Sequence, residues 1–248
     1  MLATGRRVPL RWRAMDPDQL VLLPLWYAVF LLSVTCHEAG HAFVAYRGGD
    51  STAYLGGQVT LNPLPHIQRE PFGTVLIPML SYLMMGFMMG WASAPYDPQW
   101  EERHPRRASA MAAAGPAANL ILLCIGFVVL KAGLAAQIWQ PAMPESLGFD
   151  RLVVVPDGGA IEGLGRFCSL LVSLNLLLVV LNLIPLPPLD GSAIVAGLVP
   201  AARRLRDQLR ASGIGGLAGL LIAVYSLQYL FTPLFRIVLR WLHPGYFM

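Results

Sequence analysis

The sequence predicts an all-α polytopic membrane protein, a bundle of about four to six transmembrane helices. Hydrophobic residues make up 56% of the 248 residues, and charged residues make up only 13%. A soluble domain carries about 25% charged residues, so the composition argues against one. Long stretches of the chain also hold no acidic or basic side chain at all.

Five stretches without Asp, Glu, Lys or Arg are each about as long as a transmembrane helix, which needs roughly 20 apolar residues. These windows are 19–37, 72–94, 108–130, 167–189 and 211–235. The second window is interrupted by Pro78, Gly86 and Gly90, residue types that lower the stability of a helix. We therefore expect window 72–94 to be the least regular of the five.

The segment after the first window predicts a small β-hairpin. Residues 51–62 read STAYLGGQVTLN, a β-prone run broken by Gly56 and Gly57. A pair of glycines between such runs favours a tight turn. The hairpin would follow directly on the first helix.

The basic residues indicate contact with anionic lipid. The net charge is +4, and in polytopic proteins such a surplus lies in cytoplasmic loops. Residues 201–210, AARRLRDQLR, predict an arginine-rich helix at the membrane surface. The lead, 1–18, is also basic, as in a signal peptide. Cleavage after the apolar stretch would fall at or near residues 37–41, where no A-x-A site is present, so we expect an uncleaved first helix. We do not expect nucleic-acid binding, because no basic stripe is interleaved with aromatic residues.

The residues HEAGH, 37–41, extend from the end of the first window. Histidines four residues apart lie on one face of a helix. Both imidazoles can therefore bind one metal ion, while Glu38 transfers a proton. Ionisable side chains in a spanning segment are costly and mark functional sites. The alternative is that Glu38 pairs with a histidine and serves packing only.

A zinc ion held by two histidines needs a third protein ligand and an open position for water. Asp190 is the acid that lies at the end of an apolar window, within NLIPLPPLDGSA at 182–193. Three prolines interrupt the helix before it and open space beside the carboxylate. Asp190 could instead cap the helix that follows. The unmatched histidine pair favours the metal ligand.

Together these motifs resemble the site-2 protease family of intramembrane zinc metalloproteases, in its bacterial branch without PDZ or CBS domains. HEAGH is accompanied by N-x-x-P-x-P-P-L-D-G at 182–191, and AAGPAAN at 113–119 is similar to the small-residue helix of the family. VTLNPLPH at 59–66 and GWASAPYDP at 90–98 resemble stretches of that branch. Asp97 departs from the pattern, because Asn is usual there.

The resemblance implies an enzyme that hydrolyses peptide bonds inside the membrane. His37, His41 and Asp190 would bind Zn²⁺, and Glu38 would act as the general base on a zinc-bound water. The partners would be a transmembrane or membrane-associated protein substrate and the lipid bilayer. The location would be a bacterial plasma membrane.

We expect one membrane-embedded metalloprotease domain over 1–248. Its catalytic core would cover about 19–200, and a C-terminal transmembrane helix would cover about 211–240. The hairpin at 51–62 would either hold substrate by adding a strand or shield the site.

Two asparagines at lipid depth, Asn119 and Asn182, are candidates for binding the oxyanion or the substrate backbone. Hydrogen bonding between helices is the alternative role for both. Sequence alone leaves the two roles open.

The metal site also constrains the topology. If the histidines and Asp190 share one depth, the first and fourth windows run in the same direction, and an odd number of spans separates them. Two windows, 72–94 and 108–130, lie between, so we expect 72–94 to be a re-entrant segment. The family places the site toward the cytosol, which suits the arginines of 201–210 but conflicts with the basic lead at 1–18.

Two rival functions remain open at this point. One is another membrane-anchored HExxH peptidase with a glutamate as third ligand. The other is a transporter or metal-binding scaffold without hydrolysis. The remaining glutamates lie in polar loops, and a scaffold has no need of Glu38. Both observations favour the protease.

Overall fold

The computed structural model describes residues 17–143, 146–154 and 159–246. Within that part, four helices are long and apolar enough to cross a membrane. They are α1 (Pro17–Arg47), α6 (Pro105–Ala135), α7 (Gly159–Asn182) and α10 (Gly215–Leu242). The all-α polytopic fold is confirmed, at the lower end of the predicted number of spans. The expectations for residues 1–16 of the basic lead lie outside the described residues.

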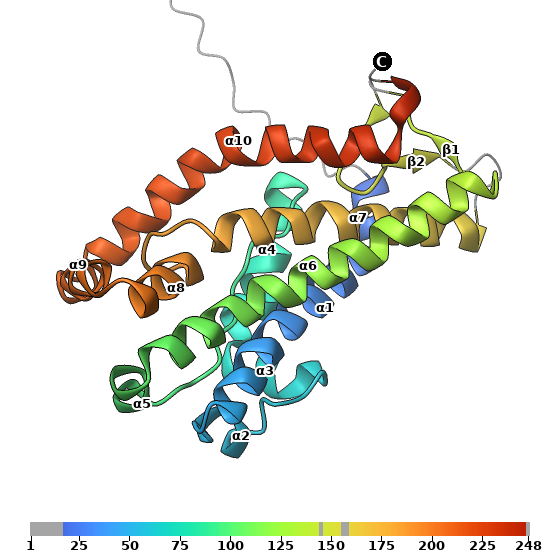
Figure 1. The fold of residues 1–248 in the computed structure, drawn as a ribbon. Coiled ribbons are helices and arrows are strands. Elements are labelled where there is room, and N and C mark those ends of the chain that lie inside the picture. The colour runs from blue at the N-terminus through green and yellow to red at the C-terminus, as the bar shows by residue number, and fades with distance from the viewer. Residues whose placement is uncertain (1–16, 144–145, 155–158, 247–248) are drawn as a thin grey trace, which may run out of the picture.

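The spans form a bundle in which α6 packs against both α1 and α7, and α10 packs mainly against α7 (Figure 1). Because α6 is the spanning candidate between α1 and α7, these two helices run in the same direction. One apolar core lies between α6, α7 and α10, around Leu130 and Val172. A second lies between α1, α4 and α7, around Phe30 and Tyr82.

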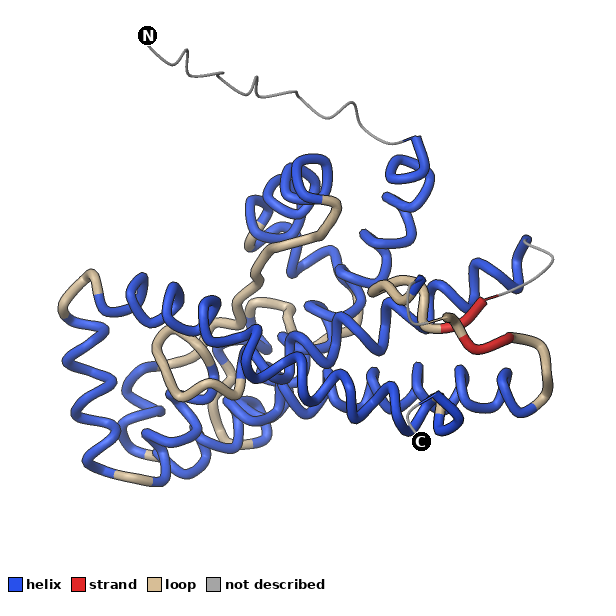
Figure 2. Tube along the Cα trace, turned by 90° about the horizontal axis from the view of Figure 1, so that it is seen from above, coloured by secondary structure: helices blue, strands red, loops and turns tan. Residues whose placement is uncertain are grey.

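Short helices gather at one end of the bundle, and a small sheet lies at the other (Figures 1 and 2). At the helical end are α5 (Pro98–Arg103), α8 (Asp190–Leu198) and α9 (Pro200–Ala211). At the other end, β1 (Gln140–Pro141) pairs antiparallel with β2 (Val153–Val154). The chain closes there with the 3₁₀-helix η3 (Pro244–Tyr246). The end with the short helices is also the end toward which the HEAGH residues of α1 lie.

Window 72–94 contains a helix that is too short to span. A π-helical turn, η1 (Phe72–Leu76), runs into α4 (Ile77–Met85). At roughly 1.5 Å per residue their combined length is about 21 Å, less than the ~30 Å of a hydrocarbon core. Gly86 adopts a positive φ of 71° and ends α4. The chain then continues without regular structure as far as α5.

The two ends of this window lie side by side. Trp91 N donates to the Gly73 carbonyl oxygen at 3.0 Å, and Ser93 Oγ donates to Glu70 Oε1 at 2.5 Å. The segment therefore returns to the level at which it starts. This is the re-entrant path that the parity of the spans requires.

The predicted hairpin is wrong in position. Residues 51–62 form no strand: Thr52–Leu55 make α2, and turns lead from there to α3 (Pro63–Arg69). The antiparallel two-stranded sheet in the described part is β1 with β2, between α6 and α7. The protein therefore does contain a small antiparallel hairpin after the first helix, as expected, but it lies between α6 and α7 and not at 51–62.

A local hydrogen bond explains why 51–62 is helical at its start. Asp50 Oδ1 accepts from Thr52 N at 2.9 Å and from Thr52 Oγ1 at 2.5 Å. Such side-chain bonds to the backbone compete with strand pairing. Although burial raises the pKa of the Asp50 carboxyl, the bonds from Thr52 and from Asp97 N outweigh it and keep that pKa below its ordinary value. The charged carboxylate thus ties the end of α1 to the segment before α5.

Candidate active site

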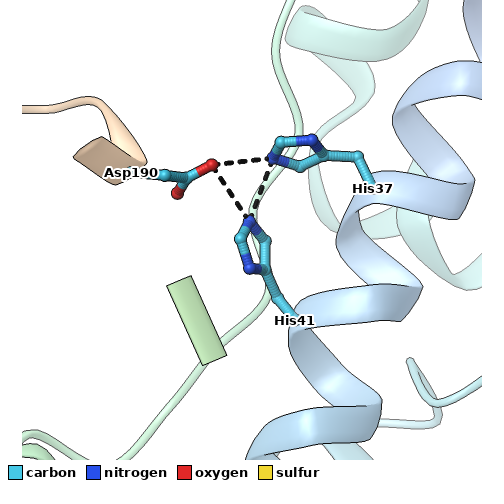
Figure 3. Close-up of side chains that lie close together, drawn as sticks. All are labelled: His37, His41 and Asp190. Atoms are coloured by element: carbon cyan, nitrogen blue, oxygen red, sulfur yellow. Dashed lines mark hydrogen bonds and ion pairs between the residues drawn. The ribbon is translucent and has the colours of Figure 1, made fainter. Parts of the chain in front are cut away.

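Three side chains from α1 and α8 converge at one point (Figure 3). His37 and His41 are buried on adjacent turns of α1, and their Nε2 atoms lie 3.0 Å apart. Asp190 Oδ2 lies 3.1 Å from His37 Nε2 and 3.4 Å from His41 Nε2. The structure therefore brings together the three residues that the sequence predicts as metal ligands.

Close packing of α8 brings Asp190 to the histidines. A Cβ on Gly191 would collide with the carbonyl oxygens of the turn at 183–184, so only glycine permits this approach. Ser109 Oγ on α6 donates to the Ile194 carbonyl oxygen at 2.8 Å and fixes α8 against α6. Leu189 is the N-cap of α8, and no side-chain hydrogen bond caps the helix. The capping role considered for Asp190 is therefore not observed.

A buried relay of amides sets the orientation of the His37 ring. Asn119 Nδ2 donates to the Ser33 carbonyl oxygen at 3.2 Å and to Asn175 Oδ1 at 2.8 Å. Since the Ser33 carbonyl can only accept, the other end of the amide, Asn119 Oδ1, faces His37 Nδ1 at 2.6 Å. His37 therefore donates through Nδ1, and in the neutral imidazole its Nε2 carries the lone pair that can bind a metal.

His41 reaches the same state by a different bond. Its Nδ1 lies 2.8 Å from the carbonyl oxygen of Met111 on α6. Because a carbonyl only accepts, Nδ1 carries a proton, and in the neutral imidazole Nε2 carries the lone pair. In that neutral form, which binds metals, both histidines present an unprotonated nitrogen to Asp190.

This arrangement fits a bound cation. Three acceptor atoms face one another at 3.0 to 3.4 Å, and Asp190 Oδ2 is buried without a hydrogen-bond partner in the described part of the chain. Acceptors repel one another in a buried site unless a positive charge lies between them. Ligand bonds of about 2.0–2.2 Å around tetrahedral zinc place ligand atoms about 3.3–3.6 Å apart, close to the distances seen here. His37, His41 and Asp190 can therefore hold a zinc ion.

The sequence comparisons agree with this site. Residues 26–226 match the family model described as Peptidase family M50. The chain belongs to peptidase family M50. This is the site-2 protease family, so the resemblance noted in the sequence is confirmed, and the protein is a zinc metalloprotease by family.

Two relatives of the chain are named as zinc metalloproteases. Over 218 residues the chain is 37% identical to "Putative zinc metalloprotease YwhC" of Bacillus subtilis, covering 87% of each protein. Over 178 residues it is 33% identical to "Putative zinc metalloprotease Rip2" of Mycolicibacterium smegmatis, covering 71% of this chain and 58% of that relative. No solved structure matches the chain.

The small residues of the M50 motifs leave room for the site. A Cβ on Gly115 of α6 would lie 2.5 Å from His37 Nε2 and would also overlap the His41 ring. A Cβ on Gly40 would lie 2.8 Å from the Ala114 carbonyl oxygen. Glycine at both positions lets α1 and α6 meet at His37 and His41.

The remaining predicted site residues differ in their surroundings. Glu38 is 6% exposed, beside His37, and is not one of the three grouped ligands. Asn182 ends α7 and is partly exposed, and its side chain makes no hydrogen bond within the described residues. Asn119 is 0% exposed and uses both ends of its amide between helices. The hydrogen bonds of Asn119 are those of the interhelical alternative. A direct role of Asn119 in substrate binding stays a prediction.

The sequence did not point to the residues that orient the two histidine rings, directly or through Asn119. These are Ser33, Met111 and Asn175, of which Met111 acts through its backbone. Asn175 Nδ2 donates to Ser33 Oγ at 2.9 Å, so the two side chains join α7 to α1. Their signal in the sequence was a polar side chain inside an otherwise apolar window.

Proposed function

We propose that the protein hydrolyses peptide bonds of transmembrane or membrane-associated protein substrates. His37, His41 and Asp190 bind the zinc, and Glu38 is the general base. The observation that carries this proposal is the convergence of two histidine lone pairs and a carboxylate oxygen in a buried site. In the described part of the chain, no glutamate joins that group, which disfavours a peptidase with a glutamate as third ligand.

Each residue has a separate task in the reaction. His37, His41 and Asp190 would hold the zinc, which would supply Lewis-acid chemistry: a lower pKa, about 7, for a bound water and a polarised scissile carbonyl. Glu38 accepts a proton from the water and returns it to the leaving amine. Its burial at 6% exposure keeps competing water away from this transfer. Asn182, which is partly exposed at the end of α7, is the amide that can bind the oxyanion or the substrate backbone.

The position of the site suits a substrate within the membrane. The histidines lie on a candidate span, α1, and the amide relay that holds His37 comes from two others, α6 and α7. A peptide must therefore enter among membrane helices to reach the zinc ligands. Because the curated relatives are bacterial, we place the protein in the plasma membrane of a bacterium, in contact with the lipid bilayer.

Zinc content and cleavage measured together test this mechanism. Purified protein and its Glu38→Gln and Asp190→Ala variants would be assayed for bound zinc and for cleavage of a model transmembrane peptide. Glu38→Gln should keep zinc and lose cleavage by about 100-fold or more, since it removes the base alone. Asp190→Ala should lose both, because it removes a ligand. Glu102→Gln, which removes an exposed acid on α5, is the matched control and should change neither.

Normal cleavage by Glu38→Gln would contradict the role of the base. Full zinc binding by Asp190→Ala would contradict the ligand set.

A further inference from the structure

A pocket of about 410 Å³ lies where α1 ends and α6 begins. Its lining residues come from both helices and from the turn after α1: Val44, Arg47, Gly48, Gly49, Arg107 and Ala110. Arg47 is the last residue of one candidate span, and Arg107 belongs to the first turn of another. The pocket therefore lies where two candidate spans have their ends.

Two arginines give the pocket a positive charge that the described residues do not neutralise. Neither Arg47 nor Arg107 has a carboxylate within ion-pair distance in the described part of the chain. Arg206 at the same end of the bundle differs, because it is buried and paired with Glu101 of α5 and with Asp207. Arg47 and Arg107 thus lack a carboxylate partner such as Arg206 has in Glu101.

One of the two guanidinium groups is held in place. Arg107 Nη1 donates to the Gly48 carbonyl oxygen at 3.1 Å, and Trp100 Nε1 donates to the same oxygen at 3.0 Å. The remaining nitrogens of Arg107 stay available as donors. A fixed guanidinium is well suited to bind the oxygens of a phosphate, and a bidentate pair is among the stronger hydrogen-bonded contacts in proteins.

The other features of the pocket favour a lipid as the source of that phosphate. Val44 and Ala110 give the pocket apolar walls beside the two arginines. Phe43 and Tyr46, on the same turns of α1 as the pocket, add exposed aromatic surface, although Tyr46 also stacks on Tyr54. Basic pockets between transmembrane helices bind anionic headgroups. We propose that this pocket binds the headgroup of an anionic phospholipid.

The site would connect the lipid to the metal ligands without depending on catalysis. Val44 lies three residues after His41 on α1, and Ala110 precedes Met111, whose carbonyl holds the His41 ring. A headgroup bound by both arginines would bridge α1 and α6 beside these residues. Binding of the headgroup requires only the folded protein, so it can be tested independently of the protease mechanism.

Competition between lipids in nanodiscs tests the proposal. Protein in nanodiscs of phosphatidylcholine with a minor fraction of phosphatidylglycerol would be released from the bilayer, and its retained lipid would be measured by native mass spectrometry. The Arg47→Gln/Arg107→Gln variant should retain roughly tenfold less phosphatidylglycerol than the unchanged protein. Arg106→Gln/Arg204→Gln is the matched control, because it removes two exposed arginines at the same end that do not line the pocket. The control should retain phosphatidylglycerol as the unchanged protein does.

A second variant blocks the pocket sterically and leaves its positive charge unchanged. Ala110→Phe fills the pocket but keeps both arginines, and it should also lose phosphatidylglycerol while keeping the elution volume of the folded protein. Short-chain phosphatidylglycerol should displace the retained lipid, whereas millimolar inorganic phosphate should not. Equal losses in the pocket and control variants would show diffuse attraction and overturn the proposal. Displacement by inorganic phosphate alone would identify a free-anion site and would also overturn it.

Discussion

The candidate metal centre is assembled from two unlike halves. His37 and His41 lie on a long spanning helix, and the Nδ1 atom of each ring is fixed by a hydrogen bond to α6. Asp190 begins a short helix after a proline-rich turn, and its buried Oδ2 has no hydrogen-bond partner among the described residues. The histidine half is therefore ordered by the protein alone. Packing against α6 places α8, but under the proposed function the Asp190 carboxylate itself would be held by the cation that it shares with the two histidines.

The largest loss of activity is expected from a substitution that displaces the two histidine rings by adding a side chain between them. In Gly115→Ala, the new Cβ would overlap both histidine rings and push their Nε2 atoms apart. Because misplacing catalytic groups by about 1 Å costs about 100-fold in rate, cleavage should fall at least that far, and zinc content should fall with it. Zinc analysis and a peptide-cleavage assay measure the two losses.

Gly163→Ala provides the control for this helix substitution. Nothing lies within 4 Å of a Cβ at that position in α7, and alanine favours a helix over glycine. Its activity should match the unchanged protein. An active, zinc-loaded Gly115→Ala variant would show that the rings have room to move.

A smaller effect is expected from loosening the relay behind His37. Asn175→Leu removes the acceptor for one Asn119 Nδ2 hydrogen and the donor to Ser33 Oγ. The Asn119 amide would then be less firmly oriented, and zinc affinity should fall roughly tenfold, as for other residues that orient metal-bound histidines. Competition with a zinc chelator measures the affinity. The ¹⁵N spectrum of the histidines should show weaker protection of the His37 Nδ1 proton.

Ser173→Ala distinguishes this orienting role from general destabilisation. Ser173 is also buried on α7, but its hydroxyl has no partner in the described part of the chain. Its loss should leave zinc affinity and the His37 signal unchanged. Equal losses of affinity in both variants would assign Asn175 a packing role only.

The smallest effect is expected when zinc is removed and nothing is mutated. Amide hydrogen exchange should increase over 183–192, because Asp190 loses the cation that holds it. Exchange over 33–45 should stay slow, because the bonds to Asn119 and Met111 persist. Equal increases in both segments would contradict the difference between the two halves.

The fold could be predicted where the sequence pattern is long and regular. The long apolar windows predicted the four spans, because in lipid only a continuous helix satisfies its own backbone. The interruptions at Pro78, Gly86 and Gly90, together with the parity argument, predicted the re-entrant segment. The hairpin at 51–62 failed, because the Asp50 bonds to Thr52 start a helical turn where β propensity pointed to a strand.

The candidate metal ligands could be predicted because their spacing in the sequence forms a recognisable motif. The i, i+4 pair and the acid at the end of an apolar stretch need only helix geometry and zinc chemistry. For Asn119 the sequence left two roles open, because its contacts come from α1 and α7 and are set by tertiary packing. Asn175 and Ser33 were missed for the same reason, since they are 142 residues apart and meet only in the folded bundle.

The most direct test of the central claim is X-ray absorption at the zinc edge of the purified protein. We predict two imidazole nitrogens and oxygen ligands at about 2.0–2.2 Å, with one imidazole in His41→Ala. In Asp190→Ala, any zinc that remains should lose its carboxylate contribution. A sulfur ligand at about 2.3 Å, or a wild-type spectrum unchanged by Asp190→Ala, would contradict the assignment of His37, His41 and Asp190 as the metal ligands.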